Sequence, residues 1–263
     1  MQVSVLGMGW LGLPLAKVLL AHGYRVKGST TTQEKLAVLK ESGIDPYLLN
    51  LENFDSDNAA NFLSGSDTLI INIPPRVKAS ETTYANKLSL LLPVIGQEGI
   101  NKVLFVSSTS VYADDNSVVT EFTLPMPDTE SGKQVLDAEL LFEEATSFKT
   151  TIVRFGGLIG AGRHPVKFLA GKDNLANPDA SVNLIHQEDC IGIILKIIAA
   201  DSWGEVYNGV SPNHPTREEY YTVKAKELGL PSPMFNHNDP SVGKTVSGNK
   251  VVEVLGYEYL DKL

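Results

Sequence analysis

Three glycines near the start of the chain, Gly7, Gly9 and Gly12, constrain the fold more than any other feature of the sequence. They follow the apolar run 2–6, which is typical of a buried strand, and they open the helix-like apolar spacing of 10–22. Such glycines allow a tight turn out of the strand, a close backbone approach to a pyrophosphate, and close packing of the helix on the strand. Because the helix then presents free N–H groups to an anion, the segment predicts dinucleotide binding. The alternative is a turn that serves packing alone.

Strands and helices alternate along the first 155 residues of the chain. Most of the strand-like runs are apolar without a two-residue alternation, as expected of strands that are buried on both faces of a parallel sheet. The sequence therefore predicts an α/β fold, a Rossmann-type doubly wound parallel sheet with helices outside. Strands are expected at 2–6, 24–29, 46–50, 68–73, 102–107 and 150–155. Helices are expected at 10–22, 80–98 and 130–146. Two more are expected between these: one that follows Thr30–Thr32 and ends at Glu41, and one that ends near residue 64.

The composition changes after residue 155, where Gly, Pro and Asn become more frequent. We expect 1–155 to form the NAD(P)-binding Rossmann domain. Residues 156–263 are expected to form a small C-terminal substrate-binding lobe that does not fold independently. Its predicted elements are short strands at 181–185 and 205–208 and helices at 187–200, 216–228 and 248–255.

The charge balance argues against several classes of protein. The chain has 263 residues, with 22 Lys and Arg against 31 Asp and Glu, so that the formal charge is −9. A nucleic-acid-binding protein would carry a basic patch, and the scattered basic residues offer none to a membrane either. No apolar run reaches the length of a membrane span, and no signal peptide is recognisable, so a cytoplasmic location is expected. The five histidines are dispersed, so no metal site is expected.

The end of the second predicted strand bears on which dinucleotide is bound. An NAD site usually has an Asp or Glu there to contact the ribose hydroxyls. This chain instead has Ser29-Thr30-Thr31-Thr32, and its first acid is Glu34, within the next predicted helix. Hydroxyl groups, a helix N-terminus and the nearby Lys35 suit a 2′-phosphate better than a carboxylate would. NADP is therefore favoured, with NAD as the alternative, and helix capping by the threonines could coexist with this role.

Four later segments carry a family resemblance. The first reads Val106-Ser107-Ser108-Thr109-Ser110-Val111-Tyr112, and the others lie at 153–163, 182–189 and 206–208. In this order they resemble the motifs of the extended short-chain dehydrogenases/reductases, the NAD-dependent epimerase/dehydratase group. The resemblance covers nearly the whole chain. The short length and the opening glycine segment look most like a small, atypical bacterial branch, the YeeZ-like proteins.

The resemblance implies roles for individual residues. Ser107 is expected beside the nicotinamide ribose, Ser108 matches the catalytic serine, and Thr109 is expected beside the substrate. The run Ile73-Pro74-Pro75 matches the loop that passes the cofactor, and Asn50-Leu51 matches the pair that contacts the adenine. The predicted cofactor contacts are completed by Gly7, Gly9, Trp10, Leu11, Gly12, Ser29, Thr30, Thr31 and Lys35.

The chain departs from the family at the Tyr-x-x-x-Lys pair of the helix after the fifth strand. In the family, a Glu normally follows the Lys by four residues. Aligning that Glu with Glu139 puts Val135 at the Lys position and Ser131 at the Tyr position. Aligning the Lys with Lys133 instead puts Thr129 at the Tyr position. Neither register supplies a tyrosine.

This departure limits the chemistry that the chain can perform. Serine and threonine hydroxyls ionise far above a phenol, so they cannot replace it as a base near neutral pH without strong help. Either another group supplies the proton, or the usual redox step does not occur. Tyr112 is the nearest phenol in the sequence and is therefore the candidate catalytic tyrosine. The alternative is that Tyr112 is a partly buried aromatic residue beneath the loop.

Other candidate residues lie on the substrate side. Arg163 suits a bidentate anion contact, with a surface salt bridge as the alternative. His164 and His186 are further candidate bases. Lys133 is a candidate phosphate or substrate contact, and the alternative is a solvated lysine on the helix.

Two functions follow from the sequence. The first is an NADP-dependent oxidoreductase or epimerase that acts on a small carbonyl- or hydroxyl-bearing substrate or a sugar nucleotide. The second is a non-catalytic NADP-binding redox sensor or partner-binding protein. The resemblance also implies a homodimer formed through the helices at 80–98 and 130–146.

Overall fold

The computed structural model describes residues 1–75, 83–260 and 262–263. Its contacts divide the chain into two compact units. The first unit comprises Met1–Ser108, Thr129–Val153 and Ile194–Val206. The second comprises Thr109–Asp128, Arg154–Ile193 and Tyr207–Leu263. The second unit thus draws on chain from both sides of residue 155, and the predicted division into a 1–155 domain and a 156–263 lobe stays a prediction.

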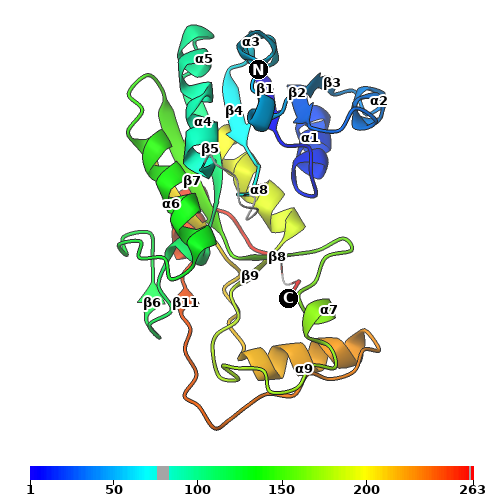
Figure 1. The fold of residues 1–263 in the computed structure, drawn as a ribbon, viewed down its shortest axis with the longest axis vertical. Helices are drawn as coiled ribbons and strands as arrows, with labels where there is room; N and C mark the ends of the chain where they lie inside the picture. The colour runs from blue at the N-terminus through cyan, green and yellow to red at the C-terminus, as the bar shows by residue number, and fades with distance from the viewer. Residues whose placement is uncertain (76–82, 261) are drawn as a thin grey trace. The chain divides into compact units, whose positions relative to one another are not determined.

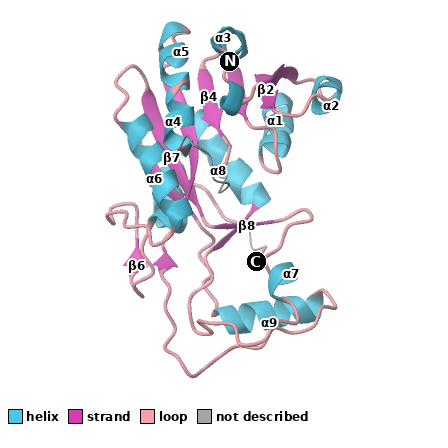
Figure 2. Cartoon of the chain, viewed as in Figure 1, coloured by secondary structure: helices cyan, strands magenta, loops and turns pink. Residues whose placement is uncertain are grey.

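A seven-stranded sheet confirms the predicted fold class (Figure 2). Its order is β10-β7-β5-β4-β1-β2-β3, and the β1/β2, β1/β4, β2/β3 and β4/β5 pairs are parallel. The strand expected at 205–208 lies in this sheet, although its predicted place was the small lobe. The strands are β1 (Gln2–Leu6), β2 (Arg25–Thr30), β3 (Asp45–Leu48), β4 (Thr68–Ile71), β5 (Lys102–Ser108), β7 (Lys149–Phe155) and β10 (Val206–Gly209).

The strand order explains where the helices of the first unit lie (Figure 1). The chain runs outward from β1 to β3 and then returns to β4 on the other side of β1. Right-handed crossovers therefore put α1 and α2 on one face and the later helices on the other. Consistent with this, α3 contacts α5 and α4 contacts α6. The helices are α1 (Gly12–Ala21), α2 (Lys35–Glu41), α3 (Ser56–Leu63), α4 (Tyr84–Ser89), α5 (Leu91–Gln97) and α6 (Glu130–Glu143).

The apolar strands form the core of the first unit. Every residue of β1 and of β4 is buried. The helix expected at 80–98 is divided between α4 and α5, and its first residues, 80–82, lie outside the described part of the chain. Pro93 accounts for the break, because its ring lacks an N–H and crowds the carbonyl of Ser89, where α4 ends.

The second unit is built from shorter elements. Strand β8 (Gly157–Ile159) pairs in parallel with β9 (Leu184–His186), and β6 (Val118–Val119) pairs with β11 (Thr245–Val246). A cluster of buried residues that includes Ile159, Leu184 and Tyr221 forms its core. Helix α8 (Gln187–Ala199) belongs partly to each unit. The remaining helices are α7 (Val166–Leu169), α9 (Arg217–Glu227) and α10 (Asn249–Leu255).

Candidate functional site

Two of the three glycines are required by packing. Gly7 has a φ of +104°, and a Cβ there would lie 2.6 Å from the carbonyl oxygen of Asn72. A Cβ on Gly12 would lie 2.1 Å from the carbonyl oxygen of Gly7. Hydrogen bonds hold the turn between them: the N–H of Gly7 donates to Ser29 Oγ (3.0 Å), and Asn72 Nδ2 donates to the Gly7 carbonyl (3.2 Å). Gly7 and Gly12 therefore let the turn and the first helix approach the end of β1.

Gly9 differs from its two neighbours. A Cβ at this position would meet no atom of residues 1–75, 83–260 or 262–263 within 4 Å, and the φ of Gly9 is not in the left-handed region. Neither packing nor backbone conformation thus requires a glycine here. Gly9 instead lines a pocket of about 340 Å³ that lies wholly within the first unit. Packing alone does not account for this glycine.

The pocket collects residues from the carboxyl ends of β1 to β4, from α4 and from α6. Ten predicted cofactor contacts line it: Gly7, Gly9, Ser29, Thr30, Thr31, Lys35, Asn50, Leu51, Ile73 and Pro74. Five others do not: Trp10, Leu11, Gly12, Pro75 and Ser107. The remaining lining residues are Leu6, Met8, Thr32, Leu49, Glu52, Thr83, Tyr84, Lys87 and Gln134.

Hydroxyl groups and one lysine lie where β2 ends. Ser29 Oγ accepts a hydrogen bond from the N–H of Gly7, and Thr30 Oγ1 accepts one from the N–H of Thr32 (3.1 Å). Thr31 and Lys35 are exposed at the pocket. The end of β2 thus contributes hydroxyls and a cation to the pocket, and no carboxylate.

The lining continues beside the end of β2 into the segment after β3, where the N–H of Leu49 donates to the carbonyl of Thr30 (2.9 Å), and on to α4. Asn50 Oδ1 accepts a hydrogen bond from the N–H of Glu52 (3.0 Å) and caps the 3-10 turn Leu51–Asn53. Glu52 Oε1 lies 2.6 Å from Lys87 Nζ on α4. The Tyr84 hydroxyl donates to the carbonyl of Ile73, and burial raises the pKa of this tyrosine above its ordinary value. Tyr84 is therefore a neutral phenol that ties α4 to the loop after β4.

Ser107 and Ser108 lie at the end of β5 in the first unit. Ser107 Oγ donates to the carboxylate of Glu139 on α6, and both side chains are buried. Ser108 is half-buried, and the neighbouring Thr109 begins the second unit as a buried residue. The contact of Ser107 with Glu139 joins β5 to α6, the helix on which the resemblance would place the tyrosine and lysine.

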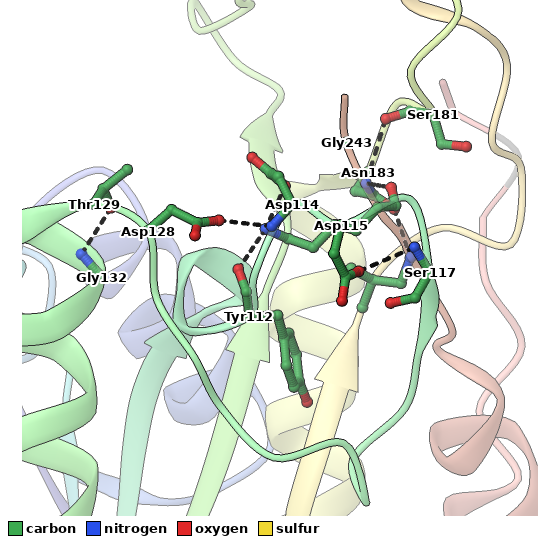
Figure 3. Close-up of polar contacts among 12 residues, drawn as sticks. Tyr112, Asp114, Asp115, Ser117, Asp128, Thr129, Gly132, Ser181, Asn183 and Gly243 are labelled. Atoms are coloured by element: carbon green, nitrogen blue, oxygen red, sulfur yellow. Dashed lines mark hydrogen bonds and ion pairs between the residues drawn. The ribbon is translucent and has the colours of Figure 1, made fainter. Parts of the chain in front are cut away.

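Tyr112 is enclosed within the second unit. Its side chain is 1% exposed. Its hydroxyl donates to Asn208 Oδ1 (2.9 Å) and accepts from Arg154 Nη1 (2.8 Å). Burial raises the pKa of Tyr112, and the nearby Arg154 opposes that effect. Figure 3 shows the ring directed away from the loop where the Asp114 N–H donates to the Asp128 carboxylate (2.7 Å). The phenol is thus satisfied as a donor and as an acceptor by buried partners.

Helix α6 presents no proton-transferring pair at the positions of the family's tyrosine and lysine. Ser131 is half-buried and Val135 is 5% exposed, one helical turn apart. Thr129 is the N-cap, because its hydroxyl accepts the N–H of Gly132 (3.0 Å). Lys133 is exposed. The α6 residue that lines the pocket is Gln134.

The remaining candidate bases have structural contacts. His164 Nδ1 accepts from the N–H of Val166 (3.1 Å), which leaves Nε2 to donate to the Tyr220 hydroxyl (3.0 Å). Burial, with Lys224 and Lys167 adding to the effect, lowers the pKa of His164. His186 Nδ1 accepts from the N–H of Glu188 (3.3 Å) at the start of α8.

Three further observations concern the class of site. Arg163 is exposed in a loop where its backbone bonds to Gly160. Within residues 1–75, 83–260 and 262–263, no three His, Cys, Asp or Glu side chains are grouped so that they could hold a metal ion. The same residues contain no helix with the length and apolar character needed to cross a bilayer.

Some pocket residues could have been found from the sequence and others could not. Glu52 directly follows the predicted pair Asn50-Leu51, so its place at the pocket was within reach of the same reasoning. Lys87 and Gln134 carry no comparable signal, because their contribution depends on how α4 and α6 pack beside the sheet.

Comparisons with known proteins agree with this geometry. Residues 2–123 match the family model for the NAD binding domain of 6-phosphogluconate dehydrogenase. Among solved structures, the dTDP-glucose 4,6-dehydratase DesIV from Streptomyces venezuelae, with NAD and TYD bound, superposes with a TM-score of 0.82 at 19% identity, over 100% of this chain and 93% of that one. The UDP-glucuronic acid 4-epimerase from Bacillus cereus, in complex with NAD, has a TM-score of 0.80 at 17% identity, with the same coverage. These similarities show a shared fold.

A relative in sequence identifies the family. The protein YeeZ from Escherichia coli strain K12 is 38% identical over 263 aligned residues, which cover 98% of this chain and 95% of the relative. An alignment of this extent spans the glycine turn, the pocket and nearly all of the second unit. The chain therefore belongs to the family of the Escherichia coli protein YeeZ.

Proposed function

We propose that the protein binds a nicotinamide dinucleotide in the pocket of the first unit and acts as an oxidoreductase or epimerase of the extended short-chain dehydrogenase/reductase type. The substrate would be a small carbonyl or hydroxyl compound or a sugar nucleotide. Gly9 carries the proposal: it lines the pocket, and no contact with the described residues requires its lack of a side chain. A cofactor phosphate group that approaches the backbone would require it.

The match of residues 2–123 to an NAD-binding domain supports the same conclusion. So do the dehydratase and the epimerase of similar fold, both of which have NAD bound. Asn50 and Leu51 would contact the adenine, and Ile73 and Pro74 would lie along the cofactor, since all four line the pocket.

NADP is our proposed cofactor in preference to NAD. The pocket's edge at the end of β2 offers Thr31 and Lys35, with the buried Thr30 behind them. A lysine and hydroxyl donors suit the 2′-phosphate, whereas the two free ribose hydroxyls of NAD are usually held by a carboxylate at that strand end.

The roles proposed for the reacting end rest on the resemblance. A bound nicotinamide would accept or donate a hydride. Ser108 would hydrogen-bond the substrate oxygen, and Thr109 and Arg163 would contact the substrate. The contacts of Tyr112 favour the alternative to a catalytic role, because transfer of its proton would disrupt two buried hydrogen bonds.

One observation favours a second candidate function, a cofactor-binding protein without catalysis. In the register anchored on Glu139, Ser131 and the buried Val135 replace the family's tyrosine and lysine, and in the register anchored on Lys133, Thr129 replaces the tyrosine. Neither a serine nor a threonine hydroxyl can replace the phenol as a proton-transferring group near neutral pH. In that case, cofactor binding would act as a redox signal or would control the binding of a partner.

We further propose a cytoplasmic location and a homodimer. Leu90, where α4 meets α5, and Leu140 on α6 are large apolar residues with 42% and 46% exposure. Both lie on the helices through which the resemblance implies dimerisation.

Calorimetric titration with NADPH and NADH tests the binding proposal. Binding of NADPH tighter than that of NADH supports it in full, and tighter NADH binding reverses the cofactor preference. A panel of carbonyl compounds and sugar nucleotides then separates the two functions. Turnover that disappears in Ser108→Ala and persists in Thr109→Ala supports the enzyme, whereas binding without any turnover supports the sensor.

A further inference from the structure

An ion pair joins two walls of the cofactor pocket. Glu52 lies in the turn after β3 and Lys87 lies on α4, 35 residues later in the chain. Lys87 Nζ and Glu52 Oε1 are 2.6 Å apart, and the side chains are 12% and 42% exposed. Both residues line the pocket.

This pair determines the balance of charge in the pocket. The lining residues include three charged side chains, those of Lys35, Glu52 and Lys87. Glu52 and Lys87 neutralise each other, and Lys35 takes part in no ion pair with the described residues. The three charges sum to +1, and because Glu52 is paired with Lys87, the charge of Lys35 is the one that no neighbouring carboxylate in the lining offsets.

A carboxylate without this partner would change which cofactor the pocket accepts. Carboxylates at the adenosine end of such sites bind free ribose hydroxyls and so favour NAD. They also repel a 2′-phosphate, and a cation within about 4 Å of the carboxylate weakens that repulsion. Glu52 is the one acidic residue among the described residues that line the pocket.

We propose that Lys87 is a specificity-determining residue, which neutralises Glu52 and thereby lets the pocket accept the 2′-phosphate of NADP. This inference rests on the proposed function, since it requires that the pocket bind the cofactor. Lys35 would be one determinant of cofactor choice, and the Glu52–Lys87 pair would be a second.

A purely structural role for the pair predicts a different result. If the ion pair only holds the turn after β3 against α4, then its loss should weaken the binding of NADPH and of NADH to the same extent. A specificity role predicts opposite effects of the two charges and no loss when both are removed together. A double-mutant cycle measured with NADPH and NADH distinguishes the two roles.

The experiment uses the full chain and the variants Lys87→Met, Glu52→Gln and the double variant, with affinities measured by calorimetric or fluorescence titration. Lys87→Met should weaken NADPH binding about fivefold relative to NADH, in line with the strength of a partly exposed charge interaction. Glu52→Gln should strengthen NADPH binding relative to NADH, and the double variant should restore the ratio close to that of the unmodified protein. Lys102→Met is the matched control, because it breaks a 2.6 Å ion pair with Asp201 in the same unit and away from the pocket lining.

Several results would overturn the inference. Equal losses for both cofactors in Lys87→Met would show a structural tie, and an unchanged ratio in all three variants would show that the pair does not affect selection. Either result leaves the proposed function standing, because both cofactors still bind. Failure of the unmodified protein to bind either cofactor refutes the proposed function, and the inference falls with it.

Discussion

The α-carbon of Gly12 lies so close to the carbonyl of Gly7 that a methyl group at position 12 would be 2.1 Å from that oxygen. The contact is with backbone, so no side chain can move aside to relieve it. We expect Gly12→Ala to destabilise the protein by about 3 kcal/mol, because the start of α1 must shift away from the end of β1. Urea unfolding followed by circular dichroism measures this. Stability equal to that of the unmodified protein would contradict the close packing.

Gly9→Ala should behave in the opposite way. Its methyl group meets no atom of the part of the chain that the structure describes within 4 Å, so the unfolding midpoint should stay close to that of the unmodified protein. Cofactor affinity should fall about tenfold or more, a cost of at least about 1.4 kcal/mol, because the methyl group occupies the space of the approaching phosphates.

Gly96→Ala on α5 is the control for Gly9→Ala, since its methyl group also makes no close contact and the residue does not line the pocket. If Gly9→Ala binds NADPH and NADH as tightly as Gly96→Ala does, then the pocket is not the cofactor site.

The difference between these glycines shows what a sequence motif conveys. The spacing of Gly7, Gly9 and Gly12 predicted the turn, and the apolar runs predicted β1, β4 and β5 within two residues at each end. These features are local, since they depend on neighbours along the chain and on burial of a strand on both faces. The break before α5 is also a local feature, because it depends on Pro93, although the sequence analysis predicted one helix over 80–98.

Contacts that depend on tertiary packing could not be predicted from the sequence. Glu52 and Lys87 are 35 residues apart, and nothing in either segment alone indicates that they meet. Gln134 lines the pocket because α6 packs beside α4, not because of its own neighbours in the chain. Two-residue strands such as β6 and β11 are too short to have a recognisable period.

Tyr112→Phe tests the role of the buried phenol. Removal of the hydroxyl leaves Asn208 Oδ1 and Arg154 Nη1 without this partner, at a cost of about 1–3 kcal/mol for buried polar groups. We expect lower stability in urea and unchanged cofactor affinity. Tyr24→Phe, whose ring is only half-buried, serves as the control. A stability equal to that of the control, together with a loss of turnover, would instead favour a catalytic role for Tyr112.

Asp189 on α8 predicts an unusual dependence of stability on pH. Its carboxylate is 1% exposed and accepts hydrogen bonds from the Tyr257 hydroxyl (2.8 Å) and from the N–H of Leu260 (2.9 Å). Burial raises the pKa of Asp189, and these two hydrogen bonds oppose that effect only in part. The folded state thus holds the Asp189 proton at a higher pH than the unfolded state does. As pH rises from the unfolded pKa to the folded one, this group's contribution to stability falls.

Two substitutions separate the charge of Asp189 from its hydrogen bonds. Asp189→Asn keeps an acceptor and removes the buried charge, so at pH 7 its stability should equal or exceed that of the unmodified protein. This difference should narrow as the pH falls through the folded pKa towards 4, because the native carboxyl group then becomes neutral as well. Asp189→Ala should lose about 2 kcal/mol at pH 7, since Tyr257 and Leu260 are left without their acceptor. Urea unfolding at pH 7, 5.5 and 4 measures all three proteins, and a gap between the unmodified protein and Asp189→Asn that widens on acidification would contradict the raised pKa.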